Sequence, residues 1–179
     1  MLVLPGCGGR AGQDTLSDIT ALYASADRFD SRISIRVELP DRTMDYVIDW
    51  QYDAGRSTLT VVEPLPIAGI ACETDDSGLT FRYADAVLQV DPSGEGVSPL
   101  EAPAELLFGW SGGLVQDCCP SVWNEEEALA VTYSQTRGAD NYTQRVWFDP
   151  ERLTPLCAEL YEGDTLALTC EFLTFQINP

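Results

Sequence analysis

Apolar and polar residues alternate along several stretches of the chain. In residues 31–39 an apolar residue occupies every second position from Ile33 onward, and polar residues stand between them. Residues 45–53 repeat the pattern, with Trp50 on the apolar side and Asp49 on the polar side. Because successive side chains of a strand point to opposite faces, this alternation predicts strands with one buried and one solvated face. Such strands are typical of antiparallel sheets.

Further strands follow, separated by turns and prolines. Pro64 and Pro66 interrupt the β-type sequence after residue 63, since proline cannot donate to a sheet ladder. A turn at residues 75–78 separates two shorter strands. We expect about ten strands, six before the middle of the chain and four near its end. The predicted strands are residues 31–39, 45–53, 56–64, 69–74, 79–84, 86–91, 128–135, 142–149, 155–162 and 166–175.

Two segments follow the helical period instead. Residues 14–30 carry apolar residues at spacings of three and four, with Asp14 as the expected N-cap. Residues 98–110 begin with Ser98, and Glu101 follows three positions later in a capping-box arrangement. The chain is therefore predicted to contain a helix, six strands, a second helix and four strands. The apolar stripe of the first helix consists of Leu16, Ile19, Leu22 and Tyr23.

The last two strands are expected to form a hairpin whose register separates two cysteines. A two-residue turn would place Cys157 opposite Cys170, but it would also mix polar and apolar residues on one face. A three-residue loop at residues 162–164 matches apolar with apolar positions instead. Because a slip of one residue moves every side chain to the other face, the cleaner pattern is favoured. We therefore expect Cys170 on the core face, Cys157 on the other face, and no disulfide between them.

The composition excludes several classes of function. The 179 residues carry a formal net charge of −19 and no histidine. Such a surface repels nucleic-acid phosphates, so no nucleic-acid partner is expected. Without histidine there is no imidazole base, no Ser-His-Asp or Cys-His nucleophile and no histidine metal ligand. We expect a single domain and a monomer, with no enzymatic activity, no metal and no cofactor.

Two short motifs resemble reactive sites. Residues 109–113 fit the pattern G-x-S-x-G, but they end a predicted helix, and no histidine can activate Ser111. We expect a helix C-terminus there. Cys118 and Cys119 are adjacent, and they either form a vicinal disulfide or remain two buried or half-exposed thiols.

The N-terminus resembles the end of a bacterial lipoprotein signal. Leu4-Pro5-Gly6-Cys7 places a leucine three positions before a cysteine and a small residue directly before it. In such signals the cysteine is lipidated and the peptide is cut before it. The resemblance implies a signal-peptide remnant at residues 1–6, a lipidated tether at 7–13 and one domain at 14–179. Cys7 would then hold the chain on the extracytoplasmic face of the cell membrane; the alternative is an ordinary cysteine in a flexible N-terminus.

Five phrases between residues 30 and 177 carry a resemblance to a known family. They are "VVEPLPIAGI", "LTFRYADAVLQV", "SPLEAPAELLFGW", "RVWFDPERLTPLCAELYEGD" and "LALTCEFLTF". With them the chain resembles the LolA/LolB-like superfamily of lipoprotein carriers, and most of all a Gram-positive LolA-like surface lipoprotein. The resemblance implies an α+β, mainly β fold, in which a strongly curved antiparallel sheet forms an incomplete half-barrel covered by two helices. In that superfamily the apolar concave face holds acyl chains.

Two functions follow from this architecture. An open curved sheet leaves an apolar concave face that two helices cover only in part, so the leading hypothesis is a binding protein for a lipid or a lipoprotein acyl chain. The alternative is an envelope sensor or regulatory module of the same fold, with a filled core and a protein partner. The candidate ligand-lining residues are Ile35, Val37, Tyr46, Ile48, Trp50, Leu59, Val61, Phe81, Tyr83, Leu106, Leu107 and Trp110.

Overall fold

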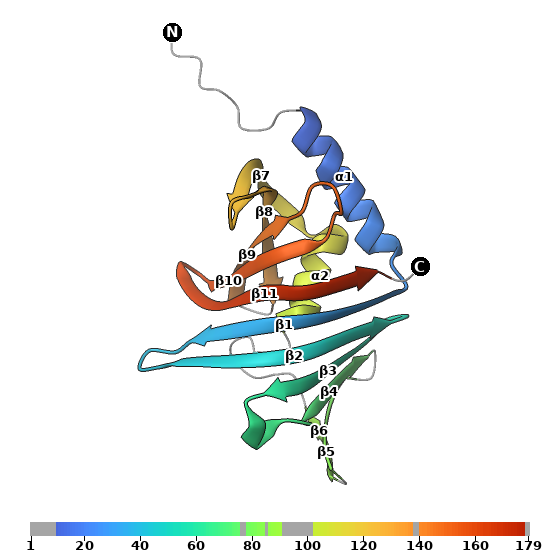
Figure 1. Cartoon of the computed structure of the whole chain (residues 1–179), viewed down its shortest axis with the longest axis vertical. Helices are drawn as coiled ribbons and strands as arrows, with labels where there is room; N and C mark the ends of the chain where they lie inside the picture. The colour runs from blue at the N-terminus through green and yellow to red at the C-terminus, as the bar shows by residue number, and fades with distance from the viewer. Residues whose placement is uncertain (1–9, 76–77, 85, 91–101, 138–139, 178–179) are drawn as a thin grey trace.

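The computed structural model describes residues 10–75, 78–84, 86–90, 102–137 and 140–177. Eleven strands within these ranges form one antiparallel sheet (Figure 1). Their order is β6-β5-β4-β3-β2-β1-β11-β10-β9-β8-β7, so β1 and β11 join two meanders. The strands are β1 (Arg28–Glu38), β2 (Thr43–Asp53), β3 (Arg56–Glu63), β4 (Ala71–Asp75), β5 (Gly78–Tyr83), β6 (Ala86–Val90), β7 (Leu114–Trp123), β8 (Glu126–Arg137), β9 (Asp140–Phe148), β10 (Pro155–Glu162) and β11 (Thr165–Ile177).

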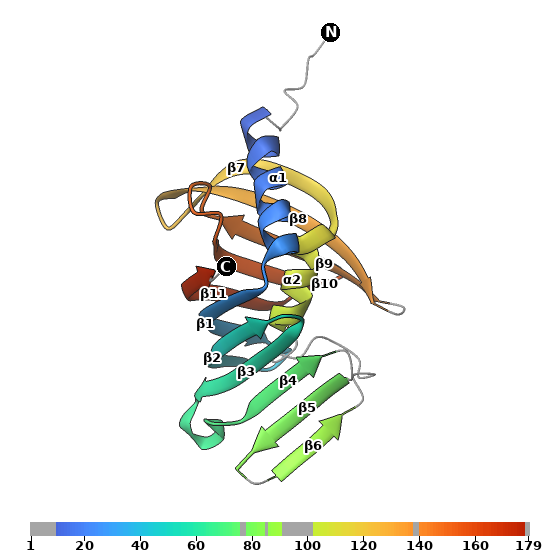
Figure 2. The same cartoon turned by 90° about the vertical axis from the view of Figure 1, so that its right-hand side faces the viewer.

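Two helices lie against one face of this sheet. Figure 2 shows α1 (Arg10–Ser25) and α2 (Ala102–Gly112) on the same side of it, and a short 3-10 helix, η1 (Leu65–Ile67), joins β3 to β4. Within the described ranges the edge strands β6 and β7 do not pair with each other, so the sheet stays open. The predicted α+β, mainly β half-barrel with two covering helices is confirmed. Cys7 and the predicted cap at residues 98–101 lie outside the described residues.

The first helix begins earlier than the sequence predicts. It starts at Arg10, so residues 10–13 of the expected tether are helical and Asp14 is not the N-cap. It also ends at Ser25, so residues 28–30 of the predicted helix belong to β1 instead. The reason is a tertiary contact at Gly12. A Cβ built at this position would lie 3.6 Å from Cδ1 of Leu129, which is ordinary packing distance. The thiol of Cys118 on β7 also donates to the carbonyl oxygen of Gly12 at 3.7 Å, and this contact with the sheet favours helix where the local sequence favours a flexible tether.

β7 is not predicted from the sequence, and it brings the number of described strands to eleven instead of about ten. Its residues do not alternate, because most of them face solvent on an edge strand that pairs only with β8. Pro120 is tolerated there, since an edge strand need not donate every N–H group. Cys118 and Cys119 point to opposite faces, as neighbours in a strand must, and neither forms a disulfide. Of the two alternatives for this pair, half-exposed thiols are the one observed.

The predicted three-residue loop of the last hairpin is wrong, because Glu162 pairs with Thr165 and only Gly163 and Asp164 form the turn. A register shift between Leu160 and Tyr161 gives the predicted pairing in the rest of the hairpin. Ala158 pairs with Cys170, and Cys157 pairs with Glu171. Cys170 lies in the main core, whereas Cys157 packs with Trp147 in a smaller cluster on the other face. Both thiols are fully buried, and neither forms a disulfide. The expected separation of the two cysteines is confirmed.

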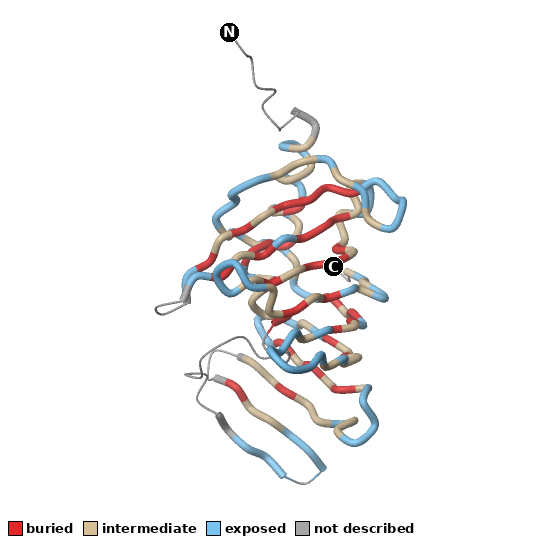
Figure 3. Tube along the Cα trace, turned by 90° about the vertical axis from the view of Figure 1, so that its left-hand side faces the viewer, coloured by how far each residue is buried: buried red, intermediate tan, exposed pale blue. Residues whose placement is uncertain are grey.

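The main core lies on the face of the sheet that α1 and α2 cover. Buried positions recur along the central strands in Figure 3, and in β1 they fall on every second residue from Phe29 to Ile35. Ile19 and Tyr23 of α1 and Leu106 and Trp110 of α2 complete this core. The alternation of apolar and polar residues in the sequence therefore reflects burial of one face of each strand.

Candidate functional site

Aromatic rings fill the space between the central strands and α2. Trp50 and Trp110 are both fully buried, and their ring centroids are 6.3 Å apart. Phe29 meets Trp50 edge-on at 4.6 Å, and Tyr23 of α1 meets Trp110 at 5.1 Å. Such pairs contribute about 0.5–1.5 kcal/mol each beyond the area that they bury. This aromatic cluster consists of Tyr23, Phe29, Trp50, Trp110, Phe148, Phe172 and Phe175.

The structure brings together most of the residues predicted to line a ligand. Ile35, Ile48, Trp50, Leu59, Leu106 and Trp110 are fully buried members of the main core. Val37, Tyr46, Phe81 and Leu107 are partly buried and pack against it. Val61 is buried outside that cluster, and Tyr83 is 51% exposed. The centre of the concave face is therefore filled by side chains, and any preformed space must lie near its margin.

The position of α2 depends on two glutamines that the sequence analysis did not single out. Gln135 on β8 and Gln144 on β9 both donate their amide N–H groups to the carbonyl oxygen of Glu105, at 2.9 and 2.7 Å. Both side chains are buried, although glutamine usually lies at the surface. Their place on the apolar side of the predicted strands is the signal that could have identified them. These bonds hold the first half of α2 over the sheet.

A pocket of about 320 Å³ lies between α2 and the concave side of β2, β3 and β4. Its α2 wall includes Leu107, which is half-buried, and Phe108, which is 65% exposed. No charged side chain is among the described residues that line it. We call it the α2 pocket. It is lined by Tyr52, Gly55, Ser57, Thr74, Ala104, Leu107, Phe108 and Ser111.

Two hydroxyl groups give the α2 pocket its polar features. Ser57 Oγ accepts a hydrogen bond of 2.8 Å from the indole N–H of Trp50, and so connects the pocket to the aromatic cluster. Thr74 Oγ1 is buried, and no hydrogen-bond partner for it lies in the described part of the chain. A buried hydroxyl without a partner costs free energy, so a ligand that bonds to Thr74 would recover that cost. The pocket therefore combines an apolar wall with one unsatisfied polar group.

The described residues give little support for a catalytic or metal site. Ser111 lies at the end of α2, as predicted, and its hydroxyl donates to the carbonyl oxygen of Phe108 at 3.3 Å. Burial raises the pKa of Cys157 to about 12 and also raises that of Cys170, so neither is a thiolate at neutral pH. Among these residues no three Cys, Asp or Glu side chains form a group suited to a metal ion. No described helix has the length and apolar character needed to cross a membrane.

Comparison with known proteins identifies the fold of the chain but not its function. No family model matches the sequence, and no curated protein matches it. A domain assigned to outer membrane lipoprotein sorting from Vibrio parahaemolyticus aligns over 94% of this chain and 93% of its own, with a TM-score of 0.53 and 10% identity. The chain shares the fold of that domain.

Other solved structures are similar to the chain at comparably low identity. A DUF1329 family protein from Desulfovibrio piger covers 94% of this chain and 92% of its own, at 8% identity and a TM-score of 0.53. A LolA superfamily protein from Nitrosomonas europaea covers 94% of both chains at 12% identity, with a TM-score of 0.48. At these identities the likeness concerns the fold alone, and function must be argued from the site.

Proposed function

We propose that the chain is a non-enzymatic, extracytoplasmic lipoprotein that binds a hydrophobic ligand at the α2 pocket. The observation that carries the proposal is the combination of an apolar wall and a buried, unsatisfied hydroxyl in one pocket. Leu107 and Phe108 form the wall, and Thr74 supplies the hydroxyl. An acyl chain with a polar end group matches both features, since the chain covers Phe108 while the polar end bonds to Thr74.

The size of the pocket limits the ligand. Its volume of about 320 Å³ lies at the lower end of the range of about 300–1,000 Å³ that is typical of small-molecule sites. Trp50 and its aromatic neighbours fill the adjacent space, so a long chain could enter further only if those side chains moved. The ligand is therefore a short acyl chain, or the end of a longer one.

A lipid anchor at Cys7 belongs to the same proposal. It rests on the motif Leu4-Pro5-Gly6-Cys7, after which α1 begins at Arg10. A net charge of −19 repels anionic lipid, so a stable hold on a membrane requires covalently attached acyl chains. Anchoring would keep the α2 pocket close to a source of acyl chains.

The ligand hypothesis is tested by titrating decanoate into the purified chain while tryptophan fluorescence is recorded. Because Ser57 lines the pocket and accepts the indole N–H of Trp50, binding should change the fluorescence of Trp50 in a saturable way. Phe108→Asp should abolish the change, because it places a charge on the apolar wall. The matched control is Leu65→Asp, which changes a side chain that is 84% exposed on η1 and does not line the pocket.

The results of this titration distinguish binding at the α2 pocket from a nonspecific, detergent-like effect of decanoate. A response that is lost in Phe108→Asp and in Trp50→Phe, but kept in Leu65→Asp, supports the proposal. An equal response in the Phe108 and Leu65 variants refutes it. Native mass spectrometry of the purified chain gives a second readout, since a co-purifying lipid adds a defined mass.

A second candidate function is recognition of a protein partner. Two observations favour it: the filled aromatic cluster, and the exposed apolar side chains of Val87 and Leu88, which are 60% and 64% exposed on the edge strand β6. A photo-crosslinker at Leu88 should then capture a defined protein in cells, and no acyl ligand should alter the fluorescence of the chain. Crosslinking at Leu173, which is 50% exposed on β11, provides the control.

A further inference from the structure

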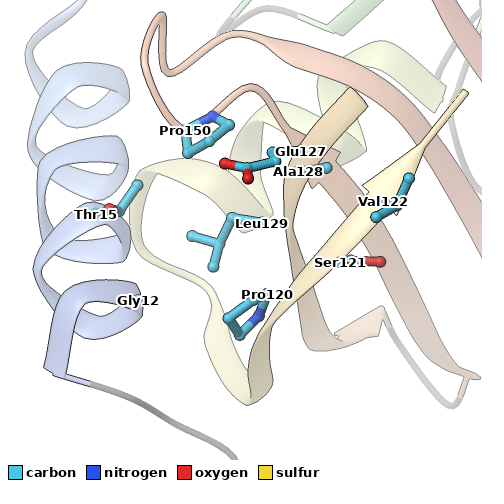
Figure 4. Close-up of a pocket in the computed structure, with 9 residues that line it drawn as sticks. All are labelled: Gly12, Thr15, Pro120, Ser121, Val122, Glu127, Ala128, Leu129 and Pro150. Carbon is cyan, nitrogen blue, oxygen red and sulfur yellow. The ribbon is translucent and has the colours of Figure 1, made fainter. Parts of the chain in front are cut away.

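A second pocket, of about 580 Å³, lies between α1 and the edge of the sheet formed by β7 and β8. Figure 4 shows Leu129 at its centre, Pro150 and Glu127 on one side of this leucine and Pro120 on the other. The pocket is built from elements other than those of the α2 pocket. We call it the α1 pocket and define it by Gly12, Pro120, Val122, Glu127, Leu129 and Pro150.

Most residues that line the α1 pocket are apolar, and the polar ones are Thr15, Ser121 and Glu127. Leu129 is only 4% exposed, whereas Val122 is 63% exposed at the pocket's margin. Gly12 of α1 faces Leu129, since a Cβ built at position 12 would lie 3.6 Å from Cδ1 of that leucine, and the thiol of Cys118 donates to the carbonyl oxygen of Gly12 at 3.7 Å. A pocket with a buried floor and an exposed apolar rim suits a ligand with an apolar body.

One carboxylate gives the α1 pocket its electrostatic character. Glu127 is the sole charged residue among the described residues that line it, and Figure 4 shows its carboxylate directed toward α1. It makes no ion pair within the described ranges. An anionic ligand is repelled by this carboxylate and by the net charge of −19, whereas a cation is attracted by both.

We propose that the α1 pocket binds a small amphiphilic cation, an apolar chain that carries one ammonium group. The chain lies along Leu129 and Val122, and the ammonium group donates to the carboxylate of Glu127. The start of α1 fixes this orientation, because a helix N-terminus carries a partial positive charge that disfavours a cation near Gly12. In Figure 4, Gly12 and Glu127 lie on different sides of Leu129.

The test compares decylamine, decanol and decanoate by isothermal titration calorimetry on the full chain carrying Phe108→Asp, so that ligand binding at the α2 pocket does not contribute to the signal. We expect decylamine to bind more tightly than decanol, and decanoate to bind weakest. Glu127→Gln should weaken decylamine binding about three- to fivefold, as expected for loss of an exposed ion pair, and should leave decanol binding unchanged. Glu126→Gln removes the same charge from the neighbouring residue, which does not line the pocket, and should leave the affinity for decylamine unchanged.

A blocking variant locates the site. Val122→Arg should abolish the binding of decylamine and decanol, and the exposure of Val122 allows the variant to fold, as circular dichroism can verify. Because every protein in this test carries Phe108→Asp, the result does not depend on the proposed function of the α2 pocket. Equal losses in the Glu127 and Glu126 variants, unchanged binding in folded Val122→Arg, or no binding of decylamine to the chain that carries Phe108→Asp alone would each overturn the proposal.

Discussion

Gly109 of α2 lies directly against the side-chain amide of Gln144 on β9. A Cβ built at position 109 would be 2.7 Å from Oε1 and 2.9 Å from Nε2 of that amide. Gln144 is fully buried and donates to the carbonyl oxygen of Glu105 at 2.7 Å, one turn earlier in the same helix. Glycine therefore sets how closely α2 approaches the sheet, and this approach shapes one wall of the α2 pocket.

Gly109→Ala should destabilise the fold. The added methyl group forces the amide of Gln144 away from its position over Glu105, and overpacking of this kind costs about 1–3 kcal/mol. Gly112→Ala is the matched control, because nothing lies within 4 Å of a Cβ there and alanine is favoured over glycine in helices by about 0.5–1 kcal/mol. Urea unfolding measures both; equal shifts in the two midpoints would contradict the close approach at position 109.

Trp50→Ala should lower the free energy of unfolding by about 3–5 kcal/mol, as expected when a large aromatic side chain is removed from a packed core. The ring is fully buried against Phe29 and Trp110, and its indole N–H is bonded to Ser57. Trp50→Phe keeps most of the packing and should cost clearly less. Chemical denaturation measures both losses, and a loss for Trp50→Ala well below this range would indicate unfilled space beside the ring.

Stability should decline at alkaline pH. Burial raises the pKa of Cys157 from its ordinary value of 9.0 to about 12, so the folded state keeps this proton after the unfolded state has lost it. Between about pH 9 and pH 12 the unfolded state therefore binds fewer protons, and the free energy of unfolding falls as the pH rises. Cys157→Ala should make this fall less steep. The two proteins should show the same pH dependence below pH 8, and parallel curves above pH 9 would refute the assignment.

Cys7→Ser should release the protein from the membrane. Each buried methylene of an attached acyl chain contributes about 0.8 kcal/mol, so losing the lipidated cysteine removes the free energy that holds the chain. Fractionation of cells that carry the full-length gene measures the change. Cys157→Ala serves as the control and should stay in the membrane fraction; a Cys7→Ser protein that also stays there would rule out the anchor.

Periodicity predicted the faces of the strands correctly, including the placement of Cys170 and Cys157 on opposite sides of the sheet. It failed for β7, because an edge strand exposed to solvent has no buried face to impose alternation. It also placed the start of α1 too late, since the hydrogen bond from Cys118 to Gly12 joins residues more than one hundred positions apart. The two failures have different causes: β7 lacks a buried face, whereas the start of α1 depends on a contact that is distant in the sequence.

Local patterns in the sequence were sufficient for the class of fold, because burial of one face repeats every second residue in a strand and leaves a readable trace. The lack of histidine was likewise enough to exclude catalysis that depends on an imidazole base. Only the packed chain decided that Trp50 and Trp110 meet, that Gln135 and Gln144 hold α2, and where space remains beside the helices. These features depend on how distant segments approach one another, and a pocket is the volume that such packing leaves unfilled.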